Sequence, residues 1–95
     1  MDSIDAPRAV ELLREATGDL YVLVRRLNGG ETGAHEVVCS PREERLVLKW
    51  EVRPESQVLR REAVALTDLL RTRAGWPVPR QRTLDGGGCL VVLQE

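Results

Sequence analysis

One long segment of helical periodicity, residues 54–72, limits the folds open to this chain, because short β-rich runs stand on both sides of it. Apolar side chains recur in this segment every three or four residues, which is the spacing of one helix face. Glycine, proline and polar residues separate the surrounding runs, which cover residues 20–27, 35–39, 46–51, 80–84 and 89–94. Strands grouped on either side of one helix predict an α+β fold with a five-stranded antiparallel sheet.

A second, shorter helix is predicted over residues 6–16. Asp5 is placed to cap its start, Pro7 lies in its first turn, and Gly18 follows its end. We therefore divide the chain into an N-terminal helical segment, residues 1–19, and a sheet domain, residues 20–95. A chain of 95 residues builds one modest core. We expect the apolar stripe of the long helix to pack against the sheet.

Composition excludes several functions. The net charge of −1 argues against nucleic-acid binding, and a small winged-helix DNA-binding protein is the weakest of the functions we consider. No apolar run approaches the roughly 18 residues of a membrane span. The N-terminus lacks the pattern of a signal peptide, which favours the cytoplasm, where Cys39 and Cys89 stay reduced. Two distant cysteines and the single histidine, His35, do not make a metal site.

Lys49 is the only lysine among the 14 basic residues, and it lies inside an apolar run. A strand interior is unfavourable for an ammonium group without a partner. Strand alternation sends Val47 and Lys49 to one side of the sheet and Leu46, Leu48 and Trp50 to the other. Glu62 falls within the apolar stripe of the long helix, where a carboxylate also needs a partner. Lys49 and Glu62 therefore form either a structural ion pair or a phosphate site beside an apolar wall.

A glycine-rich turn, a strand lysine and a helix glutamate follow one another in the nucleotide-binding lobe of kinases. In this order and spacing, residues 20–95 resemble the aminoglycoside/choline/macrolide phosphotransferases, which have a protein-kinase-like fold. The resemblance is carried by RLNGGETG at 26–33, LVLK at 46–49, LRREA at 59–63, GWPVP at 75–79 and CLVVLQE at 89–95. It implies an ATP-binding N-lobe that ends at the hinge, with sheet order 2-1-3-5-4. Cys39 and Cys89 would then lie three strand spacings apart, about 14 Å, and stay free.

The resemblance also implies the roles of individual residues. Residues of the glycine-rich turn would lie over the phosphates of ATP, and Thr32 would add its hydroxyl. Lys49 would bind the α- and β-phosphates and be oriented by Glu62. Val47 would contact the adenine, Leu93 would close its pocket, and backbone groups near Gln94 and Glu95 would begin the hinge contacts. The turn residues in these roles are Gly29, Gly30, Thr32 and Gly33, although the family often has Asn at the position of Gly33.

The chain lacks the H-x-D-x-x-x-x-N loop and the later aspartate with which kinases orient the acceptor and hold Mg²⁺. We therefore expect the lobe to need a C-lobe that binds Mg²⁺ and the acceptor, an aminoglycoside or similar small molecule. These 95 residues alone should not turn over substrate. The alternative is a non-catalytic interaction module that keeps the fold and self-associates through apolar surface near Val47, Val78, Leu84 and Leu93.

Overall fold

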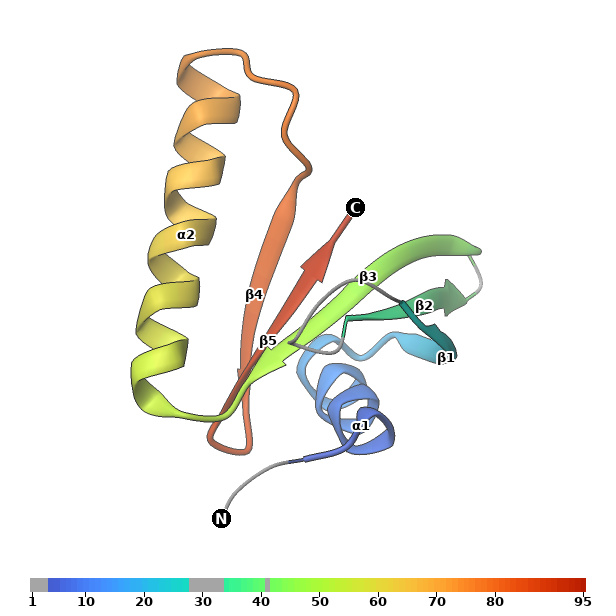
Figure 1. The fold of residues 1–95 in the computed structure, drawn as a ribbon. Coiled ribbons are helices and arrows are strands. Elements are labelled where there is room, and N and C mark those ends of the chain that lie inside the picture. The colour runs from blue at the N-terminus through green and yellow to red at the C-terminus, as the bar shows by residue number, and fades with distance from the viewer. Residues whose placement is uncertain (1–3, 28–33, 41) are drawn as a thin grey trace.

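The computed structural model describes residues 4–27, 34–40 and 42–95, and it confirms the predicted α+β layout (Figure 1). Two helices and five strands follow one another along the chain. They are α1 (Ala6–Thr17), β1 (Leu20–Arg26), β2 (His35–Ser40), β3 (Glu44–Glu51), α2 (Pro54–Arg73), β4 (Gln81–Gly86) and β5 (Cys89–Gln94). The observed bounds differ from the predicted ones by at most two residues at either end of each element.

The ends of α1 have the predicted local causes. The Asp5 carboxylate accepts a hydrogen bond from the Arg8 amide at 3.0 Å, which caps the N-terminus. Gly18 adopts a left-handed φ of 77° and donates its N–H to the Arg14 carbonyl. The predicted turn between β4 and β5 also has a local cause. Gly87 and Gly88 both have positive φ, as a tight two-residue hairpin requires.

The sheet is antiparallel throughout, in the order β1-β2-β3-β5-β4. The expected order 2-1-3-5-4 is therefore wrong at the β1 edge: β2, not β1, lies beside β3. The link between β2 and β3 is only residues 41–43, and antiparallel strands joined by so short a link pair directly with each other. Cys39 lies opposite Glu44 at the start of that pairing.

The main hydrophobic core lies between α1 and one face of the sheet, and Leu90 and Val92 of β5 are buried on the other face. Leu12 and Leu13 of α1 are buried with the sheet residues Tyr21, Leu48 and Leu93. The long helix α2 packs against β3 and β4, as predicted, but none of its residues is buried, so its apolar stripe is not part of this core. Figure 1 shows α2 alongside β4, on the far side of that strand from α1. Four apolar residues were expected on an exposed surface. Leu93 is buried, and the other three are half-buried: Val47, Val78 and Leu84.

Cys39 and Cys89 are both buried and free, as predicted. The spacing that keeps the two cysteines from forming a disulfide differs from the expected one. Strand β3 separates β2 from β5, which puts the two cysteines two strand spacings apart, about 10 Å. They also lie toward opposite ends of β3, since Cys39 pairs with Glu44 and Leu90, next to Cys89, pairs with Glu51. A disulfide needs Cα atoms within about 7 Å, so no bridge forms.

Candidate functional site

The candidate site occupies the face of the sheet opposite α1. Residues Leu46 and Leu48 of β3 belong to the α1 core, so alternation turns Val47 and Lys49 to the other face, as predicted. Glu51 shares this second face and accepts hydrogen bonds from α2, which shows that α2 lies on the same side. We call this surface the Lys49 face.

Lys49 is half-buried at the centre of this face. Its Nζ donates to Oε1 of Gln94 at 3.4 Å, and Nε2 of Gln81 donates to the same oxygen at 3.4 Å. The strand register explains why these three side chains lie side by side. Gln94 pairs with Val47 of β3 on one side and with Gln81 of β4 on the other. Both hydrogen bonds are long and therefore weak. The Lys49 ammonium is positioned by the fold but only loosely held.

Val47 lines a shallow hollow of about 210 Å³ next to the end of β1. Beside it, Glu36 of β2 accepts hydrogen bonds from Arg25 at 2.9 Å and from Arg45 at 3.0 Å. The Glu36 side chain is 12% exposed, and these hydrogen bonds from Arg25 and Arg45 hold the pKa of its carboxyl below the usual range. The hollow thus has an apolar floor and a rim whose charges are already paired.

The expected ion pair between Lys49 and Glu62 is not formed. Glu62 is exposed on α2, and within the described residues neither side chain has an ion-pair partner. The pair that joins β3 to α2 has the opposite polarity: Glu51 on the strand accepts from Arg60 on the helix at 2.7 Å. Both of these side chains are mostly buried, at 16% and 23% exposed.

Further polar contacts fix the N-terminal half of α2 in this position. Gln57 donates to the carbonyls of Val52 and Gly88 at 3.0 and 2.9 Å, and Arg61 pairs with Asp85 at the end of β4. These contacts hold α2 where Glu62 faces solvent. The site therefore contains a strand lysine without the helix carboxylate that was expected to orient it.

The remaining predicted residues divide into three groups. Leu93 is 5% exposed and packs in the α1 core, so it lies on the opposite face from Val47 and Lys49, contrary to its expected place in the same pocket. Gln94 belongs to the site through its side chain, whereas Glu95 is exposed and donates its N–H to the Arg80 carbonyl. Gly29, Gly30, Thr32 and Gly33 lie outside the described residues, in the connection between β1 and β2.

Three residues of this face were not found from the sequence, namely Glu36, Glu51 and Gln81. Glu51 had a usable signal, because it follows Lys49 by two residues and must share its face. Gln81 and Glu36 had no such signal. Their places depend on the register of β4 with β5 and of β2 with β3, which is set only when the sheet assembles.

Comparison with known proteins adds no relative: no protein-family model, curated protein or solved structure matches this chain. Of the helices within the described ranges, none is both long enough and apolar enough to cross a membrane. In the same ranges, no group of three or more His, Cys, Asp or Glu residues is arranged to hold a metal ion.

Proposed function

We propose that this chain is the ATP-binding lobe of a kinase-like small-molecule phosphotransferase similar to the aminoglycoside phosphotransferases. The observation that carries the proposal is the position of Lys49. It is half-buried on a sheet face, its only hydrogen-bond partner among the described residues is a neutral amide, and that bond is long. A partly desolvated ammonium without a counter-charge is unfavourable, and phosphate oxygens would supply that charge.

The neighbouring residues suit the rest of a nucleotide. Val47 provides an apolar surface two residues from Lys49, on which a flat base can rest. Val92 lies directly opposite Lys49 and takes the role first given to Leu93, at the back of the base pocket. Gln94 is close enough to Lys49 to orient the ammonium group, and the backbone of Gln94 and Glu95 would contact the edge of the base.

The glycine-rich connection would complete the site from the β1–β2 side. Gly29, Gly30 and Gly33 would direct N–H groups at the phosphates, with the Thr32 hydroxyl as a further donor. Bound ATP would supply the γ-phosphoryl group, which passes to a hydroxyl of an aminoglycoside or similar small molecule. The acceptor and Mg²⁺ would be held by a C-lobe, and a cytoplasmic setting fits both ATP use and free thiols.

Glu62 enters this proposal only with a change in α2. In the observed position the helix is fixed by Arg60 and Glu51, and Glu62 faces solvent. For Glu62 to orient Lys49, its side chain would have to leave solvent and reach the Lys49 face of β3. In the observed arrangement, Gln94 orients Lys49 instead.

Thermal unfolding with increasing ADP tests the proposal. We expect ADP to raise the melting temperature of the native chain, because a ligand that binds only the folded state stabilises it. Lys49→Met should abolish this rise while changing the free energy of unfolding by less than about 1 kcal/mol, since Lys49 makes one weak hydrogen bond. Arg73→Met, which removes an exposed cation from the last turn of α2, is the matched control and should keep the response.

Two outcomes would contradict the nucleotide site. One is an equal ADP response in native chain and Lys49→Met, and the other is no response in the native chain at ADP concentrations up to the millimolar range. If Lys49→Met instead unfolds the protein, Lys49→Arg separates the two roles: a nucleotide site predicts that this charge-conserving variant retains a response to ADP.

The second candidate function is a non-catalytic module that self-associates. The observation in its favour is the exposed apolar surface of α2, where Leu59, Leu66 and Leu69 are 67%, 58% and 49% exposed. Light scattering over a wide concentration range tests it. A mass that rises with concentration, together with no ADP response, would favour this candidate, and a constant monomer mass would exclude it.

A further inference from the structure

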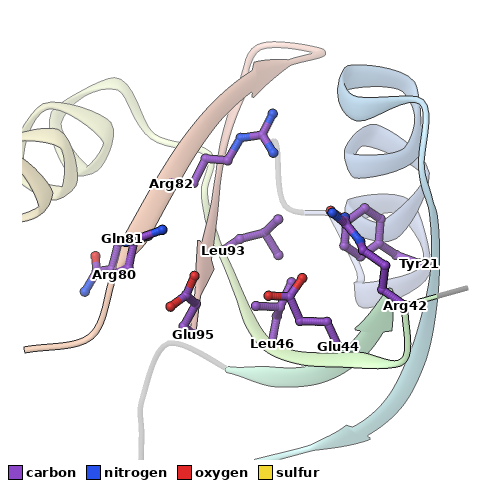
Figure 2. Close-up of a pocket in the computed structure, with 9 residues that line it drawn as sticks. All are labelled: Tyr21, Arg42, Glu44, Leu46, Arg80, Gln81, Arg82, Leu93 and Glu95. Carbon is purple, nitrogen blue, oxygen red and sulfur yellow. The ribbon is translucent and has the colours of Figure 1, made fainter. Parts of the chain in front are cut away.

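A second hollow lies on the α1 face of the sheet, away from Lys49. It has a volume of about 240 Å³ and is bounded by residues of β1, the β2–β3 connection, β3, β4 and β5. Figure 2 shows its floor and walls, to which the five parts of the chain each bring at least one side chain. The floor of this hollow lies on the opposite face from the proposed nucleotide site, because alternation places Leu46 and Leu93 opposite Val47 and Lys49. Gln81 and Glu95, at the strand ends, adjoin both sites.

The floor of this hollow is apolar and rigid. Leu46 is 7% exposed, Leu93 is 5% exposed, and the ring of Tyr21 closes one wall at 1% exposed. All three belong to the core that packs against α1, so their positions are fixed by the fold. A ligand with a short apolar body would cover the remaining exposed surface of these side chains.

Charges of both signs line the same hollow without touching one another. Arg42 and Arg82 carry positive charge, Glu44 carries negative charge, and Arg80 and Glu95 add one charge of each sign. Within the described residues, none of these arginines forms an ion pair with either glutamate. Arg42 instead contacts Asp19 at 3.5 Å and Sγ of Cys39 at 3.2 Å, which holds it at the rim.

The charges are also separated in space. In Figure 2 the Arg82 guanidinium and the Glu44 carboxylate lie on different sides of the hollow, with Leu93 between them. Glu95 lies on the Glu44 side and Arg42 on the side of Tyr21. A single bound anion would pair with Arg82 alone, and a single bound cation would pair with Glu44 alone. A molecule with an acid at one end and an amine at the other would pair with both.

We propose that this hollow binds a small zwitterion whose carboxylate and ammonium groups are separated by an apolar body, such as an ω-amino acid or an apolar dipeptide. The carboxylate would accept from Arg82, with Arg42 adding positive charge. The ammonium would donate to Glu44, with Glu95 adding negative charge. The methylene groups would lie on Leu46 and Leu93. Hydrogen bonds between ionised groups are the stronger class, so both ends contribute to binding.

The test is a titration of the chain followed by amide NMR, with three six-carbon probes of the same length: 6-aminohexanoate, hexanoate and hexylamine. We expect 6-aminohexanoate to shift the amides of Glu44, Arg82 and Leu93 and to saturate. Each of the other probes lacks one charged end and should bind at least about tenfold more weakly.

Variants then assign the two ends. Arg82→Gln and Glu44→Gln should each weaken 6-aminohexanoate at least about tenfold. Arg73→Gln, at an exposed arginine of α2, is the control and should leave binding unchanged. Arg82 and Glu44 are themselves exposed, so both variants should fold. The proposal is overturned if hexanoate or hexylamine binds as tightly as 6-aminohexanoate, if the variants bind like the native chain, or if no shift saturates.

Discussion

The fold favours the ionised form of the Glu36 carboxyl. Hydrogen bonds from Arg25 and Arg45 lower its pKa, so the folded protein favours the charged carboxylate. A carboxyl whose pKa is lower in the folded state stabilises the fold at neutral pH and loses that contribution as pH falls through its folded pKa. The three side chains span β1, β2 and β3, so this contribution acts on the β1 edge of the sheet.

We therefore expect acid to weaken the native chain more than the variant Glu36→Gln. Denaturant unfolding at a series of pH values, from neutral to below the usual pKa of glutamate, measures this difference. The native chain should lose stability over the acid part of the range, and Glu36→Gln should be less stable at neutral pH but lose less in acid. Glu55→Gln, an exposed carboxylate on α2, is the control. Parallel curves for native chain and Glu36→Gln would contradict the assignment.

For an individual side chain, the sequence predicts which face of the sheet it lies on better than it predicts its partner. Alternation along one strand was enough to put Val47 and Lys49 on the same face. The partner of Lys49 was predicted wrongly, because Gln94 meets it through pairing between β3 and β5, which join residues far apart in the chain. Leu93 was misplaced for a related reason: its face follows from the register of β5, and no local pattern distinguishes the two faces of the apolar run at 89–93.

The helix α2 shows how polar contacts position an element. Its N-terminal half is attached by the Arg60–Glu51 ion pair, the Arg61–Asp85 ion pair and hydrogen bonds from Gln57. Periodicity predicted the helix and its apolar stripe correctly in extent. It did not reveal whether the stripe is covered, because that depends on what packs against the helix.

This arrangement predicts unequal effects for the strand glutamate Glu51 and the helix glutamate Glu62. Glu51→Gln removes the charge from a mostly buried ion pair and should lower the free energy of unfolding by about 1–2 kcal/mol. Glu62→Gln alters an exposed side chain and should change it by less than about 0.5 kcal/mol. Chemical denaturation of both variants makes the comparison. A larger loss in Glu62→Gln than in Glu51→Gln would show that the helix glutamate, not the strand glutamate, holds α2.

In the molecule as a whole, the main buried cluster lies on one face of the sheet, and Leu90 and Val92 are buried on the other. The buried cluster joins α1 to the sheet, whereas α2 contributes no buried residue. The sequence predicted the fold class and all seven elements, since each has local signals. It did not predict the strand order at the β1 edge, because the family resemblance implied β1 beside β3, whereas β2 pairs with β3 through a short link. Nor did it predict how much each helix contributes to the buried core, because the length of a helix does not determine how far it is buried.

Two leucine truncations measure how much each helix contributes to the free energy of unfolding. Leu13→Ala on α1 removes a fully buried side chain and should cost about 2–4 kcal/mol of unfolding free energy. Leu66→Ala on α2 removes an exposed side chain and should cost less than about 0.5 kcal/mol. Equal losses would mean that α2 packs into a core of its own.

Methyl NMR of the chain during titration with ADP tests whether a nucleotide binds on the Lys49 face. Val47 and Val92 lie on the Lys49 face, and Leu46 and Leu93 lie on the α1 face. A nucleotide bound by Lys49 predicts saturable shifts of the Val47 and Val92 methyl groups, with much smaller shifts for Leu46 and Leu93. Unchanged valine signals, or shifts confined to the two leucines, would contradict a nucleotide site on this face.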